Sequence, residues 1–199
     1  MHTDLRRDAR IARLESTLAT RTPLEVFDPR ARRAAVAVLI RLGPSGEPEL
    51  FFIQRAEYEG DPWSGHVAFP GGREEPHDIS LADTAVRETF EETQIDLRTC
   101  AERIGKLDDL HPRSIRLPAV VVSPYVFLVS ESPEPVLSDE VANSFWVPLS
   151  ILEDRSVWHD ATVRAGSVEI SRFAFHHEGY VVWGLTERIL SGLLSLIGG

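Results

Sequence analysis

The stretch RETFEE, residues 87–92, decides how this chain is interpreted. In a helix its glutamates Glu88, Glu91 and Glu92 stand at positions i, i+3 and i+4 and share one face. Three like charges so close together repel one another and destabilise a helix unless a cation offsets the repulsion. Mg²⁺ is suited to this because its ligands are oxygen atoms, commonly a few carboxylates with water and substrate phosphate. The stretch is therefore a candidate divalent metal site, although a glutamate-rich helix face taken alone is more often solvated surface; the arginine, the glycine pair upstream and the apolar opposite face favour the metal site.

The helix that carries these glutamates is expected over about residues 80–94. Ser80 is a suitable N-cap, and Asp83 follows it as in a weak form of the capping box. The side nearly opposite the glutamates predicts a face that packs on a sheet, and its members are Ala82, Val86, Phe90 and Thr93. The pair Gly71-Gly72 follows the apolar run 67–70 and predicts a tight turn that leaves a strand.

The wider pattern resembles the Nudix box of the Nudix hydrolases, whose common form is Gly, five residues, Glu, seven residues, then Arg-Glu-hydrophobic-x-Glu-Glu-x-Gly. The match departs from this form at Thr89, which replaces the hydrophobic residue, and at Gln94, which replaces the closing glycine. Glutamine tolerates the left-handed conformation less well than glycine, so the second departure affects the helix C-cap. Neither departure touches the three glutamates that are the candidate metal ligands.

The spacing from Gly72 to Arg87 is one residue longer than in the common form, which resembles the coenzyme A pyrophosphatase branch of the family. That branch typically has two aspartates after its glycine pair. Glu75 stands at the first of these positions, and Asp78 matches the second. The longer spacing is therefore consistent with membership of that branch.

Flanking segments extend the resemblance beyond the box. The segments that are similar to the coenzyme A branch are residues 51–55, 64–72 and 180–186. A late segment seen across Nudix proteins is similar to residues 139–149, so the resemblance covers roughly residues 34–196. It implies an α/β/α sandwich with a mixed β-sheet. The pattern of strands and helices itself predicts a mixed sheet between helices, because it lacks the strict alternation of a doubly wound fold.

The expected site has three metal ligands and residues that support them. We predict that Glu88, Glu91 and Glu92 bind Mg²⁺ or Mn²⁺. Three carboxylates exceed what one hydrated Mg²⁺ usually takes from protein, which is compatible with two or more ions, and the sequence leaves their number open. Arg87 is expected to hold one of these glutamates in place through a bidentate pair. The general base that activates water is either one of these glutamates or Glu140.

The remaining residues assigned to the site each have a simpler interpretation beside the functional one. Gly71 and Gly72 are expected to let the turn approach the metal ions closely. Arg55 is a candidate phosphate clamp, and a surface charge at the end of a strand is the equal alternative. Glu140 lies in a loop before a strand, where a solvated acid is the plain interpretation. The resemblance implies a role for Glu140 as general base or extra metal contact.

Hydrophobic periodicity predicts the other elements. The runs 34–42 and 50–54, separated by the turn 43–46, predict a β-hairpin. Further strands are expected at residues 66–69, 104–107, 119–129, 144–147, 157–164, 168–175 and 180–183. Helices are expected at residues 4–20, 80–94, 148–153 and 185–197.

The chain of 199 residues is long enough for one good core. We divide it into an N-terminal helical segment, residues 1–30, and a Nudix hydrolase domain, residues 31–199. The first is expected to be a surface helix over an edge of the sheet; capping of the domain or homodimerisation are the alternatives. The net charge of -10 argues against a nucleic-acid partner, which would favour a basic face.

The cellular setting is inferred from three features of the sequence. Cys100 is the only cysteine, which rules out an intramolecular disulfide. Neither a signal peptide nor an apolar run long enough to span a bilayer is recognisable, so no membrane partner is expected. Together these features predict a cytoplasmic location.

These expectations converge on a metal-dependent hydrolase that cleaves the pyrophosphate bond of a nucleoside diphosphate-linked small molecule. The branch resemblance implies coenzyme A or acyl-coenzyme A as the substrate, with 3′,5′-ADP and 4′-phosphopantetheine or its acyl form as products. ADP-ribose, NADH and nucleoside triphosphates are the alternative substrates. A catalytically inactive Nudix domain that senses a ligand is the alternative of another class, and the intact glutamate cluster argues against it.

Overall fold

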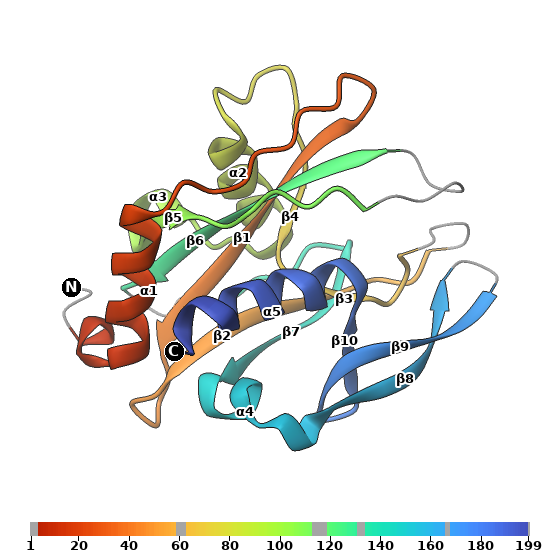
Figure 1. The fold of residues 1–199 in the computed structure, drawn as a ribbon. Coiled ribbons are helices and arrows are strands. Elements are labelled where there is room, and N and C mark those ends of the chain that lie inside the picture. The colour runs from red at the N-terminus through yellow and green to blue at the C-terminus, as the bar shows by residue number, and fades with distance from the viewer. Residues whose placement is uncertain (1–3, 59–62, 113–118, 131–133, 166–167, 199) are drawn as a thin grey trace.

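The computed structural model describes residues 4–58, 63–112, 119–130, 134–165 and 168–198 (Figure 1). Its helices are α1 (Ala9–Thr20), α2 (Leu81–Thr93), α3 (Leu97–Cys100), α4 (Leu149–Glu153) and α5 (Gly184–Ile197), with short 3-10 turns at Leu5–Arg7 and Arg155–Val157. Its strands are β1 (Arg32–Leu42), β2 (Pro48–Arg55), β3 (Val67–Ala68), β4 (Gly71–Arg73), β5 (Ala101–Lys106), β6 (Val120–Val129), β7 (Val141–Pro148), β8 (Trp158–Ala165), β9 (Val168–His177) and β10 (Tyr180–Trp183).

The described strands form two sheets. The larger has the order β3-β2-β1-β6-β5, with β4 paired to β1 and β7 paired to β2. In this sheet β1 and β6 run parallel, whereas the other pairs are antiparallel. The smaller sheet has the order β10-β9-β8 and is antiparallel. The prediction of a mixed sheet is therefore confirmed.

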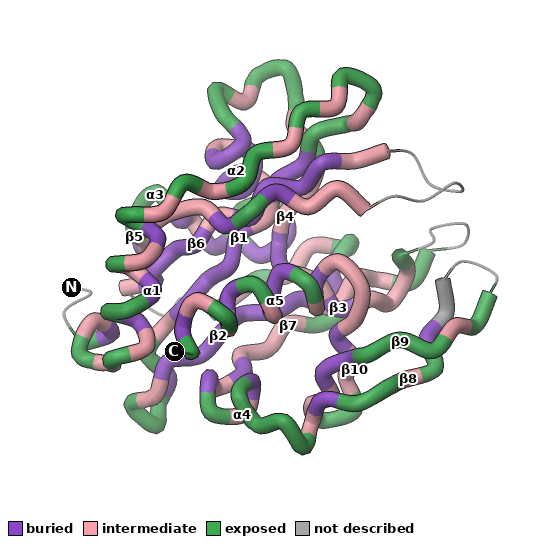
Figure 2. Tube along the Cα trace, in the orientation of Figure 1, coloured by how far each residue is buried: buried purple, intermediate pink, exposed green. Residues whose placement is uncertain are grey.

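Alternation along β1 divides the core into two layers. Val38 and Ile40 belong to the cluster that packs against α1 and α5, whereas Ala37 and Leu39 belong to the cluster that packs against α2 and α3. All four side chains are fully buried. In Figure 1, α1 and α5 lie in front of the larger sheet and α2 lies behind it. Figure 2 shows buried segments along the central strands and exposed ones on the outer loops, as an α/β/α sandwich requires.

Aromatic rings join the smaller sheet to the larger one. Phe145 on β7 stacks on Phe52 of β2, with ring centroids 5.8 Å apart, and on Tyr180 of β10, with centroids 4.1 Å apart. Phe175 on β9 is fully buried and lies 5.4 Å from the ring of Trp158. Aromatic side chains bury large areas and pack with preferred geometry, so this series of rings fixes the second sheet against the first.

The N-terminal helix begins later than expected. Residues 4–20 were predicted to be helical, but Leu5–Arg7 form a 3-10 turn and Asp8 is extended. The Asp8 carboxylate accepts a hydrogen bond from the Arg10 N–H and thereby caps α1, because an N-cap side chain replaces a missing helical partner. Ile11 and Leu14 on α1 are fully buried in the core shared with α5. No helix among the described residues is long and apolar enough to cross a membrane.

The prediction of a tight turn at Gly71-Gly72 is wrong. Both glycines belong to β4, where Gly71 pairs with Val36 and Gly72 pairs with Ala35 of β1. Gly71 has φ of 151°, and a Cβ atom there would lie 2.3 Å from the Ala35 carbonyl oxygen. The glycine is required because β4 passes this close to β1 in a conformation that side chains rarely adopt.

We expect Gly71→Ala to destabilise the fold by about 3 kcal/mol, because backbone strain adds to a clash with backbone atoms that cannot move aside. Gly179→Ala is the matched control. Gly179 also has positive φ, 86°, but no atom lies within 4 Å of the position that its Cβ would occupy. Gly179→Ala is expected to lower the free energy of unfolding by about 1 kcal/mol, from the unfavourable backbone conformation alone. Urea unfolding of both variants measures the difference, and equal losses would contradict the close approach.

Candidate active site

Helix α2 is capped at its N-terminus as the sequence predicts. The Ser80 hydroxyl accepts a hydrogen bond from the Asp83 N–H at 3.3 Å and donates one to the Asp83 carboxylate at 2.6 Å. At the other end Gln94 occupies the left-handed conformation, with φ of 58°. Its N–H and its side-chain amide both donate to the Phe90 carbonyl, at 2.8 and 3.2 Å. These bonds stabilise a conformation that glycine more usually adopts at this position.

The predicted packing face of α2 is only partly right. Phe90 was expected to face the sheet but is 41% exposed, whereas Glu92 is only 4% exposed. Thr89 and Thr93 are fully buried, and their hydroxyls donate to the carbonyls of Ala85 and Thr89 at 2.7 and 2.6 Å. Since these bonds satisfy the hydroxyls within the helix, polar residues can face the sheet. The helix is rotated so that part of the carboxylate face turns inward.

Glu92 is the buried centre of the site. Its Oε2 atom accepts a hydrogen bond from the Gly71 N–H of β4 at 2.9 Å. Burial raises the pKa of Glu92 to about 8; the Gly71 bond and Arg55 oppose that rise, and the negative charges of Glu88 and Glu140 add to it. Residues that are far apart in the sequence therefore all act on the Glu92 carboxylate.

Glu88 lies against the second glycine of β4. A Cβ atom on Gly72 would lie 2.4 Å from the Glu88 carboxyl carbon, so this carboxylate fills the space that a side chain would need. Burial raises the pKa of Glu88; Arg87 opposes that rise, and the charges of Glu91 and Glu140 add to it. The glycine pair therefore lets the sheet contact the carboxylates. It does this as part of strand β4, and not as part of the predicted turn.

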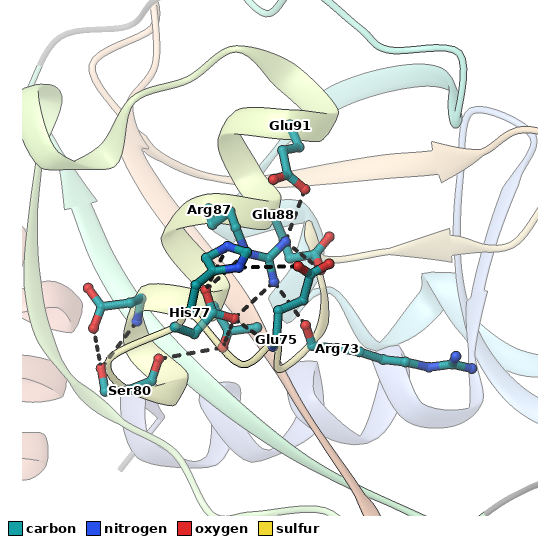
Figure 3. Close-up of polar contacts among 10 residues, drawn as sticks. Arg73, Glu75, His77, Ser80, Arg87, Glu88 and Glu91 are labelled. Carbon is teal, nitrogen blue, oxygen red and sulfur yellow. Dashed lines mark hydrogen bonds and ion pairs between the residues drawn. The ribbon is translucent and has the colours of Figure 1, made fainter.

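Arg87 lies between the loop before α2 and the glutamates Glu88 and Glu91 (Figure 3). It is fixed mainly by Asp78. Its Nε and Nη2 atoms each lie 3.0 Å from one carboxylate oxygen of Asp78, in a bidentate pair. Its Nη1 atom lies 3.0 Å from Glu91 Oε2 and 3.1 Å from Glu88 Oε1. We predicted a bidentate pair with a glutamate, which is wrong; each glutamate receives a single contact. The planar guanidinium can make only one such pair along this edge, and Asp78 takes it.

Asp78 is a site residue that sequence reasoning did not assign, although its match to the branch aspartate was a signal. Its side chain is only 3% exposed. Besides the Arg87 pair, its carboxylate accepts hydrogen bonds from the Thr84 hydroxyl and the Glu75 N–H, each at 2.9 Å. The Arg87 bonds, with those from Glu75 and Thr84, hold the pKa of Asp78 far below its usual range against the effect of burial. Asp78 therefore positions Arg87 and ties the loop before α2 to the helix.

Arg55 is the last residue of β2, and Glu140 directly precedes β7, which pairs with β2 at this end. The Arg55 N–H donates to the His66 carbonyl at 3.0 Å, and the Ala56 N–H donates to the Glu140 carbonyl at 2.8 Å. Arg55 is partly buried and Glu140 is exposed. Both act electrostatically on the buried Glu92. Arg55 at the end of a strand and Glu140 in a loop can therefore both lie at the rim of the carboxylate cluster.

The carboxylates have the donor chemistry of a divalent cation site. Glu88 and Glu92 have raised pKa values because burial and the charges of neighbouring carboxylates disfavour their ionisation, and a cation would relieve both effects. Within the described ranges, no three acidic, histidine or cysteine side chains already converge closely enough to hold a metal ion. Glu91 is directed towards Arg87 and its side chain is 55% exposed. It would join Glu88 and Glu92 only by rotating away from that ion pair.

Comparison with known proteins places this geometry in a family. Residues 31–165 match the family model of the NUDIX domain. The chain belongs to the Nudix family. Proteins described as "Uncharacterized Nudix hydrolase NudL" from Yersinia pestis (strain Pestoides F) and Yersinia pseudotuberculosis (strain IP 31758) are each 34% identical over 172 residues, covering 86% of this chain and 82% of the relative. The protein is accordingly a Nudix hydrolase, an enzyme that acts on nucleoside diphosphate-linked substrates.

A solved structure supports the fold. The MutT/nudix family protein from Enterococcus faecalis is 19% identical and covers 99% of this chain and 78% of its own, with a TM-score of 0.55. This chain and its structural neighbour thus share a mixed sheet with helices on its faces. Nudix hydrolases generally use divalent metal ions, in agreement with the donor chemistry of Glu88 and Glu92.

We expect Asp78→Asn to lower the free energy of unfolding by about 2 kcal/mol at pH 7, because the neutral amide keeps the shape but loses the charged pair with Arg87. The folded pKa is lowered, so this stabilisation is fully present above the unfolded pKa of about 3.9 and is lost as pH falls below it. Urea unfolding at pH 7, 5 and 3 should therefore show a difference that shrinks below pH ~4.

The control for that series is Asp160→Asn, which removes an exposed carboxylate from β8. It is expected to change the free energy of unfolding by less than about 0.5 kcal/mol. A loss in Asp78→Asn that stays the same at pH 3 would contradict the role of its charge.

We expect binding of Mn²⁺ at pH 7 to release about one proton, because Glu92 is largely protonated below its raised pKa and a cation needs the carboxylate. Affinity should then rise as pH rises towards 8. Titration calorimetry in buffers with different ionisation enthalpies counts the protons. Glu92→Gln should abolish the release, whereas Glu91→Gln, with Glu92 intact, should keep it. Release that persists in Glu92→Gln would show that the proton comes from elsewhere.

Proposed function

We propose that this protein hydrolyses the pyrophosphate bond of coenzyme A or acyl-coenzyme A to 3′,5′-ADP and 4′-phosphopantetheine or its acyl form. The observation that carries the hydrolytic part is the carboxylate cluster of α2 packed against β4, in which Glu92 is buried against the Gly71 N–H and Glu88 against Gly72. The choice of substrate is supported by the branch spacing of the box and by the similarity of residues 64–72 and 180–186 to the coenzyme A branch.

The proposed ligands are Glu88, Glu91 and Glu92, with Mg²⁺ or Mn²⁺ as the metal. When bound, such ions supply neutralisation of the pyrophosphate oxygens and activation of a water molecule. Glu92 is oriented by the Gly71 N–H, and Glu88 is confined by the backbone of Gly72. These two side chains therefore have little freedom to lose when the substrate arrives, which favours a well-ordered reacting geometry.

Arg87 has a positioning role in this proposal. Its bidentate pair with the buried Asp78 fixes the guanidinium, and its Nη1 atom then reaches both Glu88 and Glu91. A residue that orients ligands through hydrogen bonds raises the precision of the site without touching the substrate.

Arg55 and Glu140 contribute from outside the box, through the charges that they exert on the cluster. Arg55 is proposed to bind a substrate phosphate, because its planar guanidinium suits phosphate oxygens and its charge already acts on the cluster. The proton of the attacking water passes to one of the box glutamates or to Glu140, whose charge reaches both Glu88 and Glu92. An exposed carboxylate such as Glu140 can return that proton to solvent.

A panel of pyrophosphates tests the proposal. Coenzyme A, acetyl-coenzyme A, ADP-ribose, NADH and a nucleoside triphosphate are each incubated with Mg²⁺ or Mn²⁺, and the products are identified by mass. We expect 3′,5′-ADP and 4′-phosphopantetheine from coenzyme A to form fastest. Preferred cleavage of another substrate would overturn the choice of coenzyme A and leave the pyrophosphatase intact, whereas a protein that binds a nucleotide and cleaves none would be the ligand-sensing alternative.

The same assay examines the ligands. Glu92→Gln is expected to lower kcat by at least about a hundredfold, because several kcal/mol of charge stabilisation depend on the bound metal. Glu169→Gln, an exposed carboxylate on β9, is the matched control and should keep wild-type kcat. Circular dichroism confirms that both variants are folded. Wild-type activity in Glu92→Gln would refute the assignment of this ligand.

A further inference from the structure

A cleft of about 720 Å³ takes no part in the chemistry described above, and one of its lining residues, Gln54, directly precedes Arg55 on β2. It opens between the segment that follows β2 and the smaller sheet, near the place where β3 and β10 lie side by side (Figure 1). The side chains that give the cleft its chemistry are Gln54, Glu57, Tyr58, His66, Tyr180 and Trp183. Tyr180 and Trp183 lie outside the region that matches the family.

Hydrogen bonds connect one rim of the cleft to the rim of the carboxylate cluster. The Tyr58 hydroxyl, from the cleft, donates to the Asp139 carbonyl at 2.8 Å. The next residue, Glu140, accepts a hydrogen bond from the Ala56 N–H at its carbonyl, and its charge acts on Glu92. A molecule whose phosphates lie at the cluster can therefore extend past Tyr58 into the cleft.

The aromatic side chains that line the cleft are held in place by contacts with other rings. Tyr180 is stacked on Phe145 at 4.1 Å, and its hydroxyl accepts a hydrogen bond from the Asn143 amide. Trp183 meets His66 edge to face, with ring centroids 4.8 Å apart. Rings fixed in this way present preformed planar surfaces, and planar heteroaromatic ligands gain most from them. A flexible chain would gain less, because it must also lose its conformational freedom.

The charge of the residues that line the cleft restricts the kind of ligand further. Among the described residues that line the cleft none is a lysine or arginine, and Glu57 contributes a carboxylate. Phosphate groups, the 3′-phosphate of 3′,5′-ADP included, are therefore expected to lie outside the cleft, whereas the N–H donors of a base suit the Glu57 oxygens. The Gln54 Nε2 atom donates to the Gly65 carbonyl at 3.4 Å. The amide keeps a second N–H donor and its carbonyl acceptor, the pattern that pairs with the N6 and N7 edge of adenine.

We infer that this cleft binds the purine base of the nucleotide half of the substrate, with the adenine edge towards Gln54 and Glu57. The inference rests on the proposed function, because it assumes that the phosphates lie at the carboxylate cluster. It assigns specificity to Tyr58, Tyr180 and Trp183, and it places the pantetheine half elsewhere.

Binding without turnover tests the inference separately from the proposed function. Metal-free protein labelled with ¹⁵N-tryptophan is titrated with adenosine or with pantetheine, and the indole N–H signals are assigned with Trp183→Phe. We expect adenosine to shift the Trp183 signal and to leave the signal of the buried Trp158 in place. If pantetheine alone shifts Trp183, or neither compound does, the inference is overturned while the pyrophosphatase assay stands.

Kinetics then separate the ring of Tyr58 from its hydroxyl. Tyr58→Ala should raise KM for the cleaved nucleotide about tenfold with kcat little changed, because stacking on one base contributes about 1–3 kcal/mol. Tyr58→Phe keeps the ring, loses only the bond to Asp139, and should retain a near-normal KM. If Tyr58→Phe loses as much as Tyr58→Ala, Tyr58 acts by positioning Glu140, and its assignment to the base is wrong. Phe173→Ala, an exposed ring outside the cleft, is the control.

Discussion

The site depends on the burial of one carboxylate, that of Glu92, against the backbone of β4. A buried acid is unfavourable unless hydrogen bonds or an opposite charge compensate for lost hydration. The Gly71 N–H provides the first part of that compensation. It is available because Gly71 pairs with β1 at a φ of 151°, which brings β4 close to β1. The conformation of a glycine in the sheet and the ionisation of a glutamate on the helix are therefore coupled.

The arginine that contacts Glu88 and Glu91 does not complete the compensation. Arg87 could neutralise the cluster, but its bidentate face is taken by the buried Asp78. Only its Nη1 atom reaches Glu88 and Glu91, and Glu92 is left with a raised pKa. The arrangement preserves a surplus of negative charge while it fixes the geometry around that charge. Such a surplus has a physical use when a divalent cation supplies the missing positive charge.

The sequence was sufficient for local features and insufficient for those that depend on distant partners. Helical spacing placed the glutamates on one face, and the Ser80 cap followed from local hydrogen bonding. A helical wheel does not say which way that face turns, so the pattern predicts a buried Phe90 and an outward Glu92, the reverse of the structure. Gly71 was assigned to a turn because pairing with β1 leaves no signal nearby in the chain.

The same limit explains why Asp78 was not assigned to the site: its partner, Arg87, lies one loop and two helical turns away, and only the closed loop brings them together. The end of β2 shows a further consequence of long-range structure. Successive side chains of a strand point to opposite faces. Gln54 accordingly lines the cleft, whereas Arg55 acts on the carboxylate cluster, and a register shift against β7 falls between them. The end of β2 thus supplies one residue to the cleft and one to the carboxylate cluster. A substitution of Gln54 can therefore change the group that the cleft recognises without altering Arg55 and the pyrophosphate chemistry.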